Sequence, residues 1–165
     1  MPNVIEDLKR SVFRLGDVDP LYGGPTLAEV VADIDADAAL FRLNKHGHSI
    51  WEIVLHAAFW RCEVAHALSH GKIDRLARAP ENWPALPQRP NEDAWRADRK
   101  LLDESERALQ VALDGFAVSD WSAAPEAGGD WSLGQLAIGL IAHDAYHIGQ
   151  VALLKKAAQT ATRSH

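Results

Sequence analysis

Two histidines near the end of the chain, His143 and His147, have a spacing that can chelate a metal ion. They stand four residues apart in an apolar segment, so in a helix both imidazoles project from one face, about one turn apart. A third histidine, His56, lies within another apolar run, Ile53 to Trp60. A buried imidazole without a partner costs about 1 to 3 kcal/mol. Taken singly, each residue also fits a structural role, but one shared divalent metal ion accounts for all three, and we predict that site.

The other histidines do not suggest a comparable site. His66 and His70 are also four apart, and Glu63 precedes His66 by three residues, as in di-iron carboxylate bundles. Such a site needs a second pair and more glutamates on facing helices, which the chain does not offer, so we predict that His66 and His70 are surface residues. The remaining three we expect to be solvated: His46, His48 and His165.

The segment from His143 to His147 also invites comparison with the H-E-x-x-H motif of zinc peptidases, with Asp144 as the general base. Only 18 residues follow His147, and they contain no Asp, Glu or Cys and only the terminal His165. The third ligand must therefore come from upstream, and an all-helical chain lacks an edge strand for a peptide. We reject the peptidase interpretation.

Three neutral imidazoles leave at least one coordination position for water or a thiolate, which is typical of catalytic rather than structural zinc. Zinc, nickel or iron would suit this donor set. Glu52 lies one turn before His56 on the same predicted helix face. It is the candidate general base, or the candidate hydrogen-bond partner of a metal-binding histidine. Its alternative role is to cap the helix. Asp144 and Tyr146 are predicted to point to other faces, and Gln150 is a weaker candidate one turn beyond His147.

Helices must position these residues, and no long β-alternating run appears in the sequence. Capping boxes open two long segments, at Ser49 to Glu52 and at Ser132 to Gln135. We predict helices over Ile50–His70, Glu92–Leu113 and Leu133–Ala158, with either Val4–Leu15 or Thr26–Leu43 as the fourth bundle helix. The predicted fold is a single domain, residues 1–165, forming an all-α, up-down four-helix bundle with long connecting loops.

Composition excludes several classes of function. The net charge is −6, from 23 acidic and 17 basic residues, and no dense basic stripe is present, so we expect no nucleic-acid partner. Neither a signal peptide nor a membrane span is evident, which favours a cytoplasmic protein. The lone Cys62 excludes an internal disulfide and is expected to be a packing residue. Trp51 and Trp60 are nine apart, so one is expected to face the core and the other a dimer partner.

Two segments, HSIWEIVLHAAFW and HDAYHIGQVALLKK, resemble those of the DinB/YfiT-like superfamily of metalloenzymes. The resemblance implies a four-helix bundle in which His56, His143 and His147 bind a divalent cation, and a homodimer without DNA contact. Relatives include S-transferases that use low-molecular-weight thiols, a mycothiol-dependent maleylpyruvate isomerase and metal-dependent hydrolases. The resemblance therefore implies a thiol S-transferase or hydrolase that acts on a small electrophilic molecule. The alternative is a non-catalytic metal-binding or ligand-binding protein of the stress response.

Overall fold

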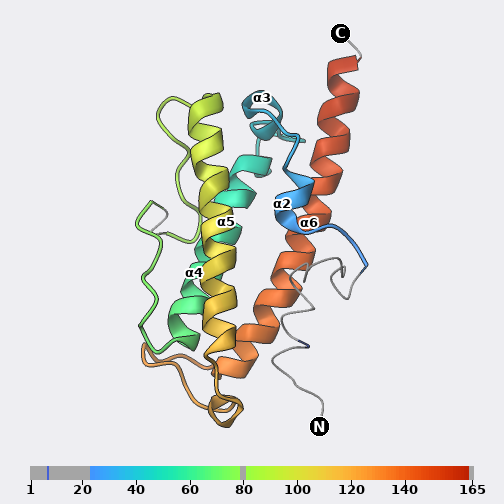
Figure 1. The fold of residues 1–165 in the computed structure, drawn as a ribbon. Coiled ribbons are helices and arrows are strands. Elements are labelled where there is room, and N and C mark those ends of the chain that lie inside the picture. Colours follow the sequence, from blue (N-terminus) through green and yellow to red (C-terminus); the bar gives the residue numbers. More distant parts are fainter. Residues whose placement is uncertain (1–6, 8–22, 79–80, 164–165) are drawn as a thin grey trace.

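Three long helices form the body of the fold, in a computed structural model that describes residues 7, 23–78 and 81–163 (Figure 1). They are α4 (Ile50–Leu68), α5 (Glu92–Asp114) and α6 (Leu133–Arg163). Two short helices, α2 (Leu27–Val30) and α3 (Ala36–Ala39), and one 3-10 turn, η1 (Val118–Asp120), complete the helical elements of these residues. No strand occurs in the described ranges, which confirms the all-α prediction.

The long helices begin where their capping residues predict. In α4, the Ser49 hydroxyl accepts from the Glu52 amide while the Glu52 carboxylate accepts from the Ser49 amide, and α6 opens in the same way with Ser132 and Gln135. Asn91 caps α5 through the amide of Ala94. These bonds satisfy amides that have no partner within the helix.

Two predicted helix ends are wrong. Helix α4 ends at Leu68 rather than His70, because His70 adopts a φ of 52° and Gly71 a φ of 75°, which turn the chain away. Helix α6 continues to Arg163 rather than stopping at Ala158. Its last five residues contain no Gly or Pro, so nothing in the sequence interrupts it.

The prediction of one helix over Thr26–Leu43 is also wrong, since α2 and α3 are separated there. Side chains of α5 bind the carbonyl groups that a continuous helix would use internally. Trp95 donates to the Ile34 carbonyl at 2.6 Å, and Arg99 donates to the Ala32 carbonyl at 3.0 Å. Asp35 then caps α3. The alternative fourth helix, Val4–Leu15, lies outside the described residues apart from Asp7.

The helices enclose two apolar clusters that lie at different heights along the bundle. One joins α2, α3, the first halves of α4 and α5 and the second half of α6. The other joins the second half of α4, the second half of α5 and the first half of α6. The boundary between the two clusters falls between Ala58 and Val64 on α4, and between Leu140 and Ile148 on α6. The three histidines lie at this boundary: His143 and His147 within it on α6, and His56 just before it on α4.

Two glycines of α6 should respond in opposite directions to the same substitution. A Cβ at Gly134 would lie 2.4 Å from the Trp121 ring, whereas a Cβ at Gly149 would meet nothing within 4 Å. We expect Gly134→Ala to lower the free energy of unfolding by up to about 2 kcal/mol, because crowding outweighs the gain in helix propensity. Gly149→Ala should raise it by about 0.5–1 kcal/mol. Urea denaturation measures both, and equal effects of one sign would contradict the predicted packing.

Candidate metal centre

Three histidine side chains from two helices converge at the middle of the bundle. His56 stands on α4, and His143 and His147 stand on successive turns of α6. The Nε2 atom of His143 lies 2.9 Å from that of His56 and 3.1 Å from that of His147. All three potential ligand atoms lie within 4.8 Å of one another, and within the described ranges this is the only such group of three or more His, Cys, Asp or Glu residues. These are the three residues that the sequence predicts as metal ligands.

The opposite ring nitrogens are held by other groups. His56 Nδ1 donates to the Asn82 carbonyl at 2.6 Å, and His147 Nδ1 donates to the Gln150 side-chain oxygen at 2.7 Å. His143 Nδ1 lies 3.8 Å from the Asp144 carboxylate. Acceptors therefore bind the Nδ1 atoms of His56 and His147, which favours the tautomer with its proton there in these two rings.

This arrangement of protons has a chemical consequence at the Nε2 atoms. In neutral rings protonated at Nδ1, the Nε2 atoms of His56 and His147 each carry a lone pair, and both atoms lie within 3.1 Å of Nε2 of His143. A cation at the centre of the three nitrogens would accept a lone pair from each. Two nitrogens bound to one zinc ion at about 2.0–2.1 Å lie within roughly 4 Å of each other, as both pairs that include His143 do. The donor set therefore suits a divalent metal ion.

The surroundings of His56 and His147 favour their neutral forms. Burial lowers the pKa of His147 to about 4, with His143 acting in the same direction. Burial likewise lowers the pKa of His56, and its neighbour His143 adds to the effect. A metal ion binds the neutral ring, so at neutral pH protons compete weakly for these ligands.

The lowered pKa of His147 predicts how the metal-free chain responds to acid. The unfolded residue takes up a proton near pH 6.5, whereas the folded residue does so only near pH 4. Between these values the unfolded state binds more protons, so stability should fall as the pH falls through this window. Urea denaturation in EDTA at several pH values measures the slope. His147→Gln should reduce that slope by up to one proton, and an unchanged slope would contradict the lowered pKa.

A buried ion pair lies next to the histidines. Arg61 of α4, 1% exposed, donates to the carboxylate of Asp144 of α6, 2% exposed, at 2.8 Å, and lies 3.4 Å from Glu106 of α5. Burial alone would raise the pKa of Asp144, but the adjacent Arg61 charge keeps it below the usual value. The second Asp144 oxygen and His143 Nδ1 are both buried, lie 3.8 Å apart and have no hydrogen-bond partner in the described part of the chain. The prediction that Asp144 points away from the site is therefore wrong.

A tryptophan from the loop between α4 and α5 covers His56. The Trp83 ring stacks on His56 with the centroids 3.8 Å apart and on His48 with the centroids 3.6 Å apart. The preceding residue, Asn82, accepts from Trp60 through its side chain as well as from His56 through its carbonyl. The sequence predicts that His48 is solvated. About half of its side chain is indeed exposed, but its ring also stacks on Trp83.

Other candidates from the sequence lie differently. Glu52 is bound to Ser49 and to Arg42, the latter at 2.6 Å, so its capping role is confirmed and its catalytic role stays a prediction. Tyr146 is exposed and packs against the edge of His147. Cys62 is buried, and burial raises the pKa of its thiol to about 11, which fits the predicted packing role.

The second histidine pair forms no such cluster. His66 Nδ1 donates to the Ile73 carbonyl at 2.7 Å, while exposed His70 lies 3.4 Å from Asp120. Glu63, the proposed carboxylate of a di-iron motif, pairs with Arg75 at 2.8 Å. The two histidines and Glu63 have separate partners, so these contacts, like the sequence, argue against a di-iron site.

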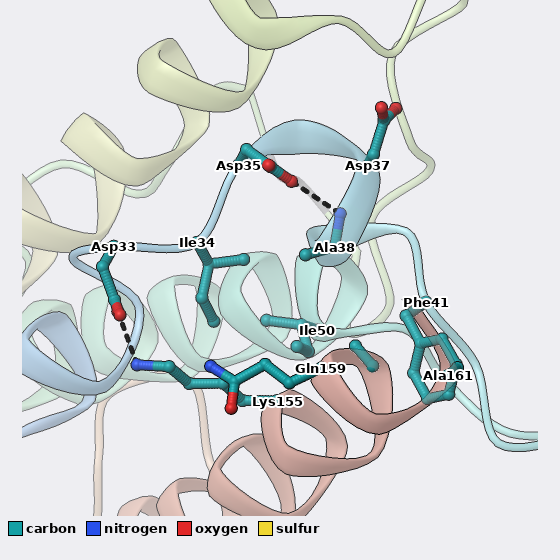
Figure 2. Close-up of a pocket in the computed structure, with 11 residues that line it drawn as sticks. Asp33, Ile34, Asp35, Asp37, Ala38, Phe41, Ile50, Lys155, Gln159 and Ala161 are labelled. Atoms are coloured by element: carbon teal, nitrogen blue, oxygen red, sulfur yellow. Dashed lines mark hydrogen bonds and ion pairs between the residues drawn. The ribbon is translucent and has the colours of Figure 1, made fainter. Parts of the chain in front are cut away.

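Two cavities border the histidine cluster, and a larger one lies elsewhere. One of about 390 Å³ touches His147 and Trp83, and one of about 190 Å³ touches His143. The larger one, about 630 Å³, lies between α3, the start of α4 and the end of α6 (Figure 2). Lys155 lines it and is bound to Asp33 at 2.5 Å. That cavity contains none of the three histidines.

The described helices include none with the length and apolar character needed to cross a membrane. Comparison with known proteins matches the model of the DinB superfamily to residues 25–151, a range that includes all three histidines of the site. No curated protein and no solved structure matches the chain. The family match covers more than half of the sequence and agrees with the helical fold, so the chain belongs to the DinB superfamily.

Proposed function

We propose that this protein is a metal-dependent enzyme that binds one divalent ion through His56, His143 and His147. The observation that supports the proposal is the convergence of three Nε2 atoms, with the rings of His56 and His147 each bound to an acceptor at Nδ1. Three protein ligands leave a coordination position for a substrate or water, as in catalytic zinc sites. Zinc, nickel and iron all suit three imidazoles.

A bound divalent ion would lower the pKa of water or a thiol and so supply a nucleophile near neutral pH. The chain's own residues orient the ligands. The Asn82 carbonyl and the Gln150 amide hold protons on Nδ1 of His56 and His147. The Asp144 carboxylate, which is bound to Arg61, lies 3.8 Å from Nδ1 of His143. Such partners raise the affinity of a histidine for metal.

The nucleophile must come from outside the protein. Cys62 is buried, and its thiol pKa of about 11 keeps it protonated at neutral pH. Water or a low-molecular-weight thiol is then the attacking group, and the reaction is hydrolysis or thiol S-transfer on a small electrophilic molecule. Glu52 is the candidate general base, although its carboxylate binds Ser49 and Arg42.

A second candidate function is a non-catalytic metal site that fastens the bundle. It is favoured by the origin of the ligands, since His56 belongs to α4 and the other two belong to α6. An ion shared by two helices stabilises the folded state whether or not chemistry follows.

Purification without chelators, followed by metal analysis by mass spectrometry, tests the proposal. We expect one equivalent of metal, its loss in His143→Ala, and turnover or adduct formation with a panel of electrophiles and thiols. Stoichiometric metal without any reaction would favour the non-catalytic alternative. Full metal occupancy in His143→Ala would show that the ligand assignment is wrong.

We also propose the homodimer that the family resemblance implies. Helix α6 exposes three large apolar side chains within a narrow arc of its surface: Ile138, Tyr146 and Leu153. Of the two tryptophans on α4, Trp51 is fully buried. Trp60 is partly buried and packs beside His143. Sedimentation of the full chain measures the oligomeric state, and a strict monomer would contradict the dimer.

A further inference from the structure

The cavity beside His143 is apolar on every side except at that residue. It lies between α4 and the first half of α6, and Trp131 of the preceding loop forms its outer wall. Its other lining residues are Trp60 and Val64 from α4, and Leu136, Gly139 and Leu140 from α6. A metal-ligand histidine and an apolar recess therefore share one space.

The size of the recess suits one compact apolar group. Its volume is about 190 Å³, and an apolar cavity of about 150 Å³ stays dry and binds benzene. The Trp60 indole N–H is already bound to the Asn82 side chain, so it offers no free donor to water in the recess. A phenyl ring or a branched alkyl group of similar size is better matched to these walls than water.

Gly139 gives the recess its shape. A Cβ at this position would lie 3.0 Å from Cζ3 of Trp131, so the absence of a side chain lets the indole lie against α6. Trp131 is 57% exposed, which leaves one face of its ring on the outside of the protein. The Trp60 ring completes the opposite wall, 6.2 Å from the His143 ring in an edge-to-face arrangement.

We propose that this recess binds an aryl or branched alkyl group of the substrate, whose metal-binding atom reaches the ion held by His143. The inference rests on the proposed function, because the recess acquires a reaction partner only if the histidines bind metal. The cavity beside His147 is the less suitable alternative, since the polar side chains of Asn44, His48 and Gln150 line it.

Thiol binding to the cobalt-substituted full chain tests the substrate class. Phenylmethanethiol and 2-mercaptoethanol both present a sulfur to the ion, but only the first carries an aryl group. The thiolate-to-cobalt absorption band reports the binding of each. Wild type should bind phenylmethanethiol about tenfold more tightly or better, because burial of an aryl ring contributes at least the free energy of a tenfold change in the dissociation constant. Equal affinities would overturn the proposal.

Four variants locate the aryl group. Gly139→Leu fills the recess and Trp131→Ala removes a wall, so both should abolish the preference while the weaker binding of 2-mercaptoethanol persists. Gly149→Leu is the matched control, since a Cβ there meets nothing within 4 Å. Leu153→Ala alters the cavity beside His147. A preference lost only in Leu153→Ala would overturn the assignment to the recess.

A probe without a metal-binding atom separates this inference from the proposed function. If the protein shows no cobalt band at all, the metal proposal fails, and fluorine NMR of fluorobenzene with the metal-free chain then decides on the recess. Binding that disappears in Gly139→Leu and survives in Gly149→Leu would support the recess. Absence of fluorobenzene binding to wild type would overturn it.

Discussion

Replacing Arg61 by methionine is expected to lower the free energy of unfolding by about 3–5 kcal/mol, because it leaves a buried charge unpaired. Arg61 is 1% exposed, and its guanidinium contacts the carboxylates of Asp144 and Glu106. Without the guanidinium, Asp144 must be protonated or remain charged away from water. Chemical denaturation of the metal-free protein measures the loss.

Two further variants make this prediction specific. Asp144→Leu combined with Arg61→Met removes both charges and should recover much of the stability, since the cost arises from an unpaired ion. Lys100→Met breaks an exposed ion pair with Glu104 and should change stability by less than about 1 kcal/mol. If Arg61→Met were as mild as Lys100→Met, the buried pair would not be the anchor that its geometry indicates.

Saturating metal is expected to stabilise the chain by about 4 kcal/mol at a free concentration 1,000 times the dissociation constant. For a chain of this length, that corresponds to a rise of roughly 8–16 °C in the unfolding midpoint. The ion would bind only the folded state, where the three Nε2 atoms meet. Calorimetry with zinc, nickel and iron(II) added to chelator-treated protein measures the effect.

His147→Gln should remove most of this stabilisation, because two ligands remain instead of three. His66→Gln provides a matched histidine control, since His66 is bound to the Ile73 carbonyl and lies outside the cluster. Asp144→Asn retains all three ligands but should weaken metal binding about 10- to 100-fold through loss of its carboxylate. An equal response of wild type and His147→Gln would exclude this residue as a ligand.

The long helices and the three histidines could be predicted because local rules determine them. Serine capping boxes mark where α4 and α6 begin, and the spacing of four residues places His143 and His147 on one face. The break between α2 and α3 could not be predicted in the same way. It depends on Trp95 and Arg99, which approach from 61 and 67 residues away along the chain.

The groups that orient the ligands were the hardest to predict. Asn82 and Trp83 lie on an irregular loop, where no periodicity indicates which way a side chain points. Arg61, by contrast, carries a signal in the sequence. A charged residue in an apolar helix needs a buried partner, and Asp144 is the acid in the facing apolar segment. Arg61 on the helix of His56 therefore indicates that Asp144 lies beside the site.

The ion pair between Arg61 and Asp144 also fixes the register of α4 against α6. Sliding one helix by a turn, about 5.4 Å, would place an apolar side chain opposite each buried charge and leave both charges unpaired. Such a displaced packing is strongly disfavoured, so the two helices meet at one height. The side chain before Asp144 is His143, and His56 precedes Arg61 by five residues on α4. The ion pair thus aligns the two halves of the histidine cluster without a cation, so a metal ion would bind to a backbone that is already in position.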